Sequence, residues 1–252
     1  MTEINEIINY FETFAPCESA MNFDNVGLLA GDKNACVTKV LVTLDITKKV
    51  VLEAKRMGCE LIISHHPVIF SPIKKLTSDS VPYLLAKNEI SALCMHTNLD
   101  LSTQFGVNTC LADAIGVKKL SLADCGECLF IGNLEKSTDI NEFALTVKSR
   151  LECKGLRYTD VKSTVKTVAI SSGSGGSNVF DAAKLGADVL VTGEIKHHEI
   201  NAANELGINI IDTGHYKSED IVISPLIKRL SEKFFDINFT KSKTYDDFIK
   251  FI

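Results

Sequence analysis

The amino-acid sequence predicts an α/β fold, with two related α/β/α lobes and mostly parallel sheets. Three observations lead to this prediction. Short runs rich in Val, Ile and Leu alternate with longer runs that have apolar residues at helical spacing. The alternation recurs in both halves of the chain, and one segment of the first half aligns on a segment of the second. Such alternation is typical of βαβ units around a parallel sheet.

The first half begins with a helix over residues 3–14, whose apolar residues recur at helical spacing: Ile4, Ile7, Ile8, Phe11 and Phe14. A turn-rich loop follows at residues 23–28. Further along, the pattern predicts these elements: strands at 40–44, 61–64 and 90–95, and helices at 47–57 and 104–115.

The second half repeats this order. Its predicted elements are strands at 129–133, 168–171, 188–192 and 208–212, and helices at 140–151, 178–185, 199–206 and 217–234. We expect a first lobe of residues 1–120 plus 208–252 and a second, related lobe of residues 121–207. Polar and small residues cluster at 118–128, near the boundary.

The two aligned segments are Glu53–Ser64 and Asp181–Thr192. Each reads as the end of a helix, a glycine at its C-cap and a buried strand. The copies differ beyond the strand: the first continues into His65-His66-Pro67 and the second into Gly193-Glu194. Two explanations fit the match: the sequence pattern common to all βαβ units, or a common origin of the two segments.

Composition excludes several classes of protein. A net charge of −5 without a basic run does not support nucleic-acid binding, and 45 % apolar residues exclude disorder. No apolar run approaches the roughly 18 residues that span a bilayer, so we expect no membrane contact. The first 32 residues contain no Lys or Arg, which predicts no targeting peptide and a cytoplasmic location. The eight cysteines then read as free thiols; Cys125 and Cys128 have metal-site spacing, but no second pair follows.

Chemistry-bearing residues follow the predicted strands. His65 and His66 follow the strand at 61–64, His96 follows the strand at 90–95, and His215 follows the strand at 208–212. Ligands of parallel sheets bind beyond the carboxyl ends of the strands, so these side chains are candidates for one metal site there, between the lobes, with its ligands carried by the first lobe. Asp100 lies four residues after His96, and Glu219 four residues after His215, on the same helix face.

Imidazoles mixed with carboxylates suit Zn, Mn, Fe, Co or Ni better than Ca or Mg. Adjacent histidines point different ways, so His65 and His66 serve two ions more easily than one. A second pair, His197-His198 followed by Glu199, is an alternative site or an outer shell. The glycine-rich stretch Ser171–Asn178 is either a flexible turn between strand and helix or a phosphate-binding turn.

As a set, these motifs resemble the GTP cyclohydrolase 1 type 2 homologue family, also described as dinuclear-metal-centre hexameric proteins. The resemblance covers essentially the whole chain and rests on the following motifs: Asp24-Asn25-Val26-Gly27, His65-His66-Pro67, His96-Thr-Asn-Leu-Asp100, Thr192-Gly-Glu-Ile-Lys-His-His-Glu199, and Gly214-His215 with Glu219. Phe23 stands where the family often has Trp, a difference that we expect to affect packing only.

The resemblance implies two divalent metal ions per subunit held by a set of five ligands: His65, His66, Asp100, His215 and Glu219. Glu219 would bridge both ions, with His96, His197 and His198 outside the ligand set. It also implies a homohexamer and hydrolytic opening of the GTP imidazole ring with release of formate. Two alternatives stay open: a metal-dependent phosphoesterase or other nucleotide hydrolase, and a non-enzymatic metal-binding regulatory assembly.

Overall fold

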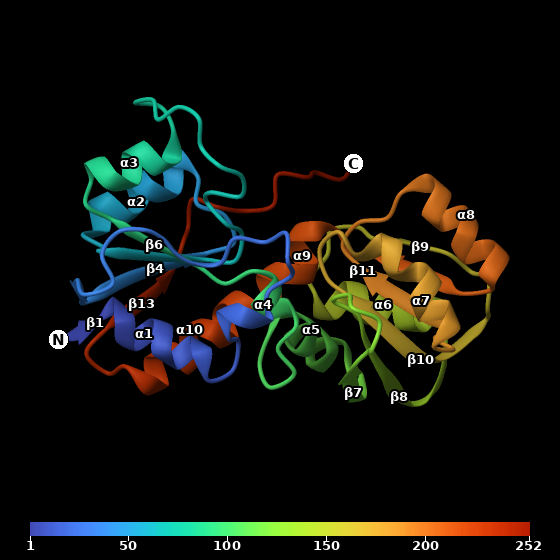
Figure 1. The fold of residues 1–252 in the computed structure, drawn as a ribbon. Helices are drawn as coiled ribbons and strands as arrows, with labels where there is room; N and C mark the ends of the chain where they lie inside the picture. Colours follow the sequence, from blue (N-terminus) through green and yellow to red (C-terminus); the bar gives the residue numbers. More distant parts are fainter. The chain divides into compact units, whose positions relative to one another are not determined.

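Two β-sheets organise the chain in the computed structural model, which describes residues 1–252 (Figure 1). Each sheet belongs to its own compact unit. Unit 1 comprises Met1–Leu99 and Ile223–Asp246, and unit 2 comprises Asp100–Val222 and Asp247–Ile252. Both sheets carry helices on their two faces, so the predicted α/β class and the α/β/α layering are confirmed.

The sheet of unit 1 is parallel except at one edge. Its strands lie in the order β13 (Asn238–Lys241), β4 (Lys39–Thr43), β5 (Leu61–Ser64), β6 (Ser91–Cys94) and β2 (Gly27–Ala30). Only β2 runs antiparallel to its neighbour. A separate short pair joins β1 (Thr2–Glu3) to β3 (Cys36–Val37). The carboxyl ends of the four parallel strands β13, β4, β5 and β6 therefore lie along the same side of the sheet, called here its carboxyl edge.

Helices cover both faces of this sheet. One face carries α2 (Lys48–Met57) and α3 (Val81–Lys87), and the other carries α1 (Ile4–Glu12) and α10 (Ile223–Lys233) (Figure 1). Val50 and Ala54 of α2 pack with Leu41 and Ile62 of the sheet in one buried cluster. This burial of apolar side chains holds helix and sheet together.

Unit 2 has a mixed sheet with a parallel centre. Its strands lie in the order β7 (Lys118–Leu122), β8 (Phe130–Asp139), β10 (Thr164–Ser171), β11 (Val189–Thr192), β12 (Asn209–Asp212) and β9 (Arg157–Tyr158). The three strands β10, β11 and β12 are mutually parallel, and the other pairings are antiparallel.

The side chains of β10 and β11 alternate between two buried clusters, as a strand period of two requires. Val189 and Val191 pack on the side of α5 (Val107–Ile115) and α6 (Ile140–Arg150). Leu190 packs on the side of α7 (Val179–Lys184) and α8 (His197–Leu206). Both faces of the sheet are thus covered by helices (Figure 1).

The units differ in their limits from the expected lobes. Residues 100–120 and 208–222, expected in the first lobe, lie in unit 2. The reason is packing: Leu111 and Ile115 of α5 share a buried cluster with Phe143 of α6, and β12 pairs with β11. Residues 118–128, expected near a boundary, begin with strand β7.

The helix expected over residues 217–234 is interrupted. The structure has α9 (His215–Glu219), a 3-10 turn η3 (Asp220–Val222) and then α10. Pro225 lies in the first turn of α10, where a residue without an N–H is tolerated, whereas it would break the interior of a continuous helix. None of the helices combines the length and the apolar character that crossing a membrane requires.

Candidate metal centre

Three histidines cluster at the carboxyl edge of the unit 1 sheet. His65 and His66 come directly after β5, and His96 comes two residues after β6. Their ring centroids lie 5.0 Å (His65–His66), 5.2 Å (His65–His96) and 5.6 Å (His66–His96) apart. One ring nitrogen of each lies within 4.8 Å of those of the other two, a spacing at which shared or neighbouring metal ions are held. His65 is buried, with 2 % of its surface exposed.

Each of these imidazoles uses its Nδ1 atom in a hydrogen bond within unit 1. The Nδ1 atom of His65 lies 2.8 Å from the carbonyl oxygen of Met95. The Nδ1 atom of His66 lies 2.9 Å from Oδ2 of Asp45, which also accepts a hydrogen bond from the hydroxyl of Tyr245. Metal-binding histidines characteristically hydrogen bond to a carboxylate or carbonyl in this way, which leaves Nε2 as the ligand atom.

His96 is oriented by a buried carboxylate. Its Nδ1 atom lies 2.9 Å from Oδ1 of Asp24, whose side chain is 0 % exposed. Burial raises the pKa of Asp24, but the hydrogen bonds from His96 and from the backbone and hydroxyl of Thr97 outweigh it and hold the pKa well below its usual range. Asp24 therefore stays ionised and fixes the ring of His96.

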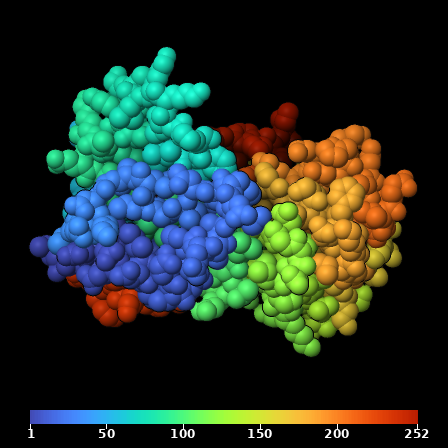
Figure 2. Space-filling view, in the orientation of Figure 1, coloured from blue at the N-terminus to red at the C-terminus, as the bar shows by residue number.

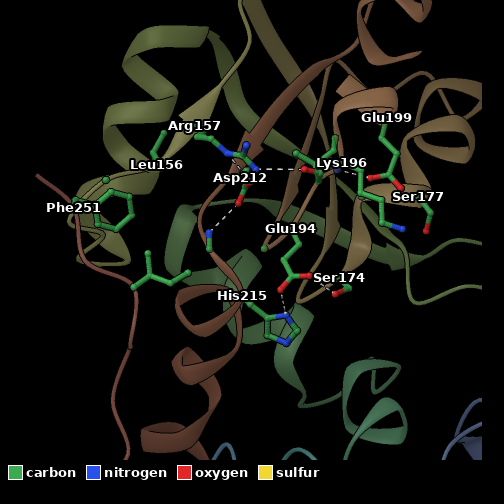
Figure 3. A pocket seen from close by; sticks show the side chains of 16 residues that line it. Leu156, Arg157, Ser174, Ser177, Glu194, Lys196, Glu199, Asp212, His215 and Phe251 are labelled. Atoms are coloured by element: carbon green, nitrogen blue, oxygen red, sulfur yellow. Dashed lines mark hydrogen bonds and ion pairs between the residues drawn. The ribbon is translucent and has the colours of Figure 1, made fainter. Parts of the chain in front are cut away.

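Unit 2 contributes a second imidazole–carboxylate pair. His215 and Glu219 lie on one face of the short helix α9, with Nε2 of His215 3.0 Å from Oε2 of Glu219. The Nδ1 atom of His215 lies 2.9 Å from Oε1 of Glu194, which follows β11 (Figure 3). The predicted shared face of residues 215 and 219 is thus present, and Nε2 of His215 points at the carboxylate expected to bind metal with it.

Glu194 is held in its ionised form by its partners. The hydroxyl of Ser174 donates to its Oε2 atom at 2.6 Å. Burial raises the pKa of Glu194, but the hydrogen bonds from Ser174 and His215 prevail and lower the pKa below its usual value. An ionised carboxylate at Nδ1 favours the His215 tautomer that leaves Nε2 to a metal ion.

The glycine-rich turn makes room for α9. Gly173 has a φ of +58°, and a Cβ atom there would lie 2.2 Å from Oε1 of Glu219. A Cβ atom at Gly193 would lie 2.4 Å from the hydroxyl oxygen of Ser218. The N–H of Gly173 already donates to that hydroxyl, at 2.9 Å. Glycine is therefore required at these two positions because α9 packs closely against them. For the stretch Ser171–Asn178 the structure thus favours a turn between strand and helix over a phosphate-binding turn.

The remaining predicted ligand, Asp100, is the last residue of α4 (Thr97–Asp100) and the first of unit 2. Asp100 is buried, with 8 % of its surface exposed. Its backbone carbonyl oxygen accepts a hydrogen bond from the side-chain amide of Asn108 at 3.1 Å. The five predicted ligands are thus divided: His65 and His66 belong to unit 1, and Asp100, His215 and Glu219 belong to unit 2.

The other histidine pair has a different environment. His197 and His198 begin α8 and are exposed. Glu199 is buried, and its Oε2 atom accepts the backbone N–H of Lys196 at 2.7 Å, which caps the helix. This carboxylate has a structural use, which accounts for its burial without a metal ion.

A pocket of about 490 Å³ lies in unit 2 beside His215 (Figure 3). Lys196 and the Arg157–Asp212 ion pair contribute charge, and Phe251 from the C-terminal segment forms an apolar wall. Its full lining comprises Gly155, Leu156, Arg157, Ser174, Gly176, Ser177, Gly193, Glu194, Ile195, Lys196, Glu199, Asp212, Gly214, His215, Ile249 and Phe251. The predicted ligand His215 is therefore reachable from a cavity large enough for a small molecule.

Sequence reasoning missed the carboxylates that orient the imidazoles. Asp45 lies two residues after β4 and Glu194 two residues after β11, so both obey the same strand-end rule that identified the histidines. Asp24 lies in the motif that carries the family resemblance, where it was given no role. Applying the strand-end rule to Asp and Glu as well as to His would have found Asp45 and Glu194.

The fold and these clusters define a class: an α/β protein of two three-layer units whose strand ends present imidazoles oriented by carboxylates, a donor set that fits divalent transition metals. The chain belongs to the Duf34/NIF3 (NGG1p interacting factor 3) family, whose model matches residues 2–247. This confirms the family resemblance inferred from the motifs.

Individual relatives agree over nearly the full length. The chain is 37 % identical to a protein of Clostridium perfringens (strain 13 / Type A) named GTP cyclohydrolase 1 type 2 homolog, covering 99 % of this chain and 100 % of the relative. The hypothetical protein SA1388 of Staphylococcus aureus has a similar crystal structure, with a TM-score of 0.89, 29 % identity and 99 % coverage of both chains. Reduced HcgD from Methanocaldococcus jannaschii matches with a TM-score of 0.84 and 28 % identity, covering 95 % of this chain and 97 % of the other.

Proposed function

We propose that this protein is a dinuclear metal-dependent hydrolase that acts on GTP or a related nucleotide. The observation that carries the proposal is the histidine cluster of unit 1, in which the Nδ1 atom of every imidazole lies within hydrogen-bond distance of an oxygen, as is typical of histidines that bind metal through Nε2. The proposed ligands are those implied by the family resemblance: His65, His66, Asp100, His215 and Glu219.

Two divalent ions held by these residues would supply Lewis acidity and lower the pKa of water toward neutrality. The chain's own residues have supporting roles. Asp45 and Glu194 keep the protons of His66 and His215 on Nδ1, and the buried carboxylate of Glu219 is the proposed bridge between the ions. Imidazole and carboxylate donors of this kind suit Zn, Mn, Fe, Co or Ni.

The substrate proposal rests on the name of the relatives and on the pocket of unit 2. The Clostridium perfringens relative is named as a homologue of a GTP cyclohydrolase, an activity that opens the purine imidazole ring and releases formate. The pocket borders His215 and contains Lys196, whose ammonium group is a suitable partner for a phosphate. We propose that this pocket receives the phosphate groups of the nucleotide.

Formate release from GTP tests the proposed reaction. Protein stripped with a chelator and reloaded separately with Zn, Mn, Fe, Co or Ni should release formate with at least one metal, and the His65→Ala variant should not. His198→Ala is the matched control, because it removes an exposed histidine at the start of α8. Release of phosphate or nucleoside instead of formate would replace the cyclohydrolase by a metal-dependent phosphoesterase or another nucleotide hydrolase.

The proposal also covers the oligomeric state, the location and the partners of the protein. The family resemblance implies a homohexamer that acts on a small molecule. The charge, the apolar pattern and the first 32 residues favour a cytoplasmic location, with neither a membrane nor a nucleic acid as a partner. Light scattering coupled to size-exclusion chromatography measures the assembly directly. If the metal is bound but no tested nucleotide is consumed, the non-enzymatic interpretation, a metal-binding regulatory assembly, takes the place of the hydrolase.

A further inference from the structure

Two phenylalanines next to the histidine cluster are unusually placed. Phe23 is 62 % exposed and Phe70 is 52 % exposed, although both are large apolar side chains. Phe23 stands where the family often has Trp, and more than half of its surface is exposed. Single exposed apolar residues are ordinary on protein surfaces, so exposure by itself indicates nothing. What distinguishes this pair is its position and how firmly it is held.

The pair is continuous with the histidine cluster. The rings of Phe23 and Phe70 lie 6.3 Å apart, centroid to centroid, and are tilted by 50°. The ring of Phe70 meets that of His96 edge to face, at 6.4 Å and 79°. An aromatic surface thus extends outward from the imidazoles, all within unit 1. Its outer faces lie in solvent, where they offer a π surface to a ligand.

Hydrogen bonds hold the two loops that carry these rings. The side-chain amide of Asn25 donates to the carbonyl oxygen of Ile69 at 2.6 Å, which ties the loop of Phe23 to the loop of Phe70. Asp24, next to Phe23, binds His96 and Thr97 through its buried carboxylate. Each phenylalanine is therefore one residue away from an anchored neighbour, which limits the freedom that binding would have to remove. The chain beyond Phe70 forms the teal protrusion of unit 1 in Figure 2.

We propose that Phe23 and Phe70 form an aromatic wall that stacks on the planar heteroaromatic ring of the substrate and holds that ring beside His96. This inference rests on the proposed function, because the ring held there would be the one that reacts. Base–aromatic stacking tolerates many ring types, since every base has a π face. The wall selects a flat ring and rejects sugars or phosphates that lack one.

The chain contains no Trp, so a single introduced Trp reports on the wall. In the Phe23→Trp variant, guanosine and GTP should quench the emission in a saturable way, and ribose 5-phosphate should leave it unchanged. Phe235→Trp is the matched control, because Phe235 is 90 % exposed and lies in the same unit after α10. Its emission should show no saturation with any of the three compounds.

A second substitution tests the partner ring. Phe70→Leu keeps an apolar side chain but removes the π face, so the guanosine dissociation constant measured in the Phe23→Trp background should rise roughly 5- to 100-fold. Phe70→Tyr should restore it. Phe180→Leu, at an exposed position of α7, should have no effect. With wild-type residue 23, Phe70→Leu should raise KM for GTP and leave kcat unchanged.

Failure of the wall and failure of the hydrolase give different results. Saturable quenching without release of formate, phosphate or nucleoside supports the wall and removes the hydrolase. Formate release with an unchanged KM in Phe70→Leu, and without quenching in Phe23→Trp, overturns the wall and keeps the hydrolase. Equal quenching by ribose 5-phosphate also overturns it. Emission that is blue-shifted, dependent on protein concentration and insensitive to guanosine overturns it in favour of a second copy covering the two rings.

Discussion

The two aligned βαβ segments end in opposite chemistry on the same scaffold. In unit 1 the segment ends in β5 and continues to His66; in unit 2 it ends in β11 and continues to Glu194 at the corresponding position. His66 bonds through Nδ1 to the carboxylate of Asp45 at 2.9 Å, and Glu194 accepts Nδ1 of His215 at 2.9 Å. Both units thus contain an imidazole–carboxylate pair. In unit 1 the aligned position holds the imidazole and the end of a neighbouring strand supplies the carboxylate, whereas in unit 2 the two are reversed.

This difference shows that the end of a strand determines the position of a polar side chain but not which amino acid occupies that position. Unit 1 uses its aligned position for a candidate metal ligand. Unit 2 uses the same position for a carboxylate that orients a ligand from elsewhere in the sheet. The scaffold is therefore shared, whereas the division between binding and orienting roles is specific to each unit.

The largest effect should come from the proposed bridging carboxylate. Glu219→Ala should lower the metal content from about two ions per chain to fewer than one, because a bridge contributes to both ions. The subunit should still fold, since α9 is a short element and only one side chain is shortened. Elemental analysis beside circular dichroism measures both. Glu205→Ala, an exposed position of α8, is the control; retention of two ions in Glu219→Ala would end the bridging assignment.

Within unit 1, the contributions of His66 and His96 to metal affinity can be compared, because both lie in the same cluster and bond to a carboxylate through Nδ1. His66→Ala should reduce the metal affinity by more than about 100-fold, and His96→Ala by roughly 10- to 100-fold, the range found for residues that support a ligand. The family resemblance leaves His96 outside the ligand set, although its ring lies 5.6 Å from that of His66. Competition with a chelator gives both affinities. An equal loss in the two variants would make His96 a ligand.

The glycine-rich turn of unit 2 allows a sharper test of packing against α9. Gly173→Ala should cost about 1–2 kcal/mol from its left-handed backbone and should also weaken metal binding, because the new Cβ displaces Glu219. Gly186→Ala is the matched control: its φ is +75°, and a Cβ there meets nothing within 4 Å. It should lose stability by a similar amount and keep its metal. Equal metal binding by both variants would contradict the account of Gly173.

The smallest effect on the metal centre is expected from a second difference between the aligned segments, which concerns stability alone. Glu53 in α2 is buried and accepts hydrogen bonds from Ser242, Lys243 and Thr244, whereas the aligned Asp181 pairs only with exposed Lys184. Glu53→Gln should lower the free energy of unfolding at pH 7 by about 2 kcal/mol, the value of hydrogen bonds to a charged group. Asp181→Asn should change it by less than about 0.5 kcal/mol.

The pH dependence of this difference has a definite sign. Burial raises the pKa of Glu53, but the hydrogen bonds from Ser242, Lys243 and Thr244 outweigh it and lower the pKa below its ordinary value of 4.5. A lowered pKa in the folded state stabilises the protein above the unfolded-state pKa, and this stability is lost as the pH falls through the folded-state pKa. The difference in unfolding free energy between wild type and Glu53→Gln, measured by urea unfolding, should therefore narrow as the pH falls from 7 to 3. A difference that does not narrow over this range would assign the effect to packing.

Much of the fold could be predicted because the apolar pattern of each strand is local. The helix, glycine and strand of the Glu53–Ser64 segment are present as expected: α2 ends before Gly58, whose φ is +68°, and β5 follows. The interruption between α9 and α10 could not be read from helical spacing, because the apolar face continues across it. Pro225 was the available signal, since it fits only the first turn of a helix.

The site was predictable to the extent that strand ends determine it. The His65, His66 and His96 cluster follows from parallel pairing of β5 and β6, a consequence of the sequence pattern. The hydrogen bonds of Asp24 to His96 and of Tyr245 to Asp45 join residues far apart in the chain, and no spacing rule reveals such pairs. The exposure of Phe23 was equally invisible, because an apolar residue in a loop reads as packing.

The most direct measurement is the number of metal ions per chain in protein purified without a chelator. The proposed dinuclear centre should hold about two divalent ions per chain, removable by a chelator and restored by one of the suitable transition metals. The His198→Ala variant should retain both ions. Protein that contains almost no metal and cannot be reloaded would contradict the dinuclear centre, and the five proposed ligands would then be structural residues.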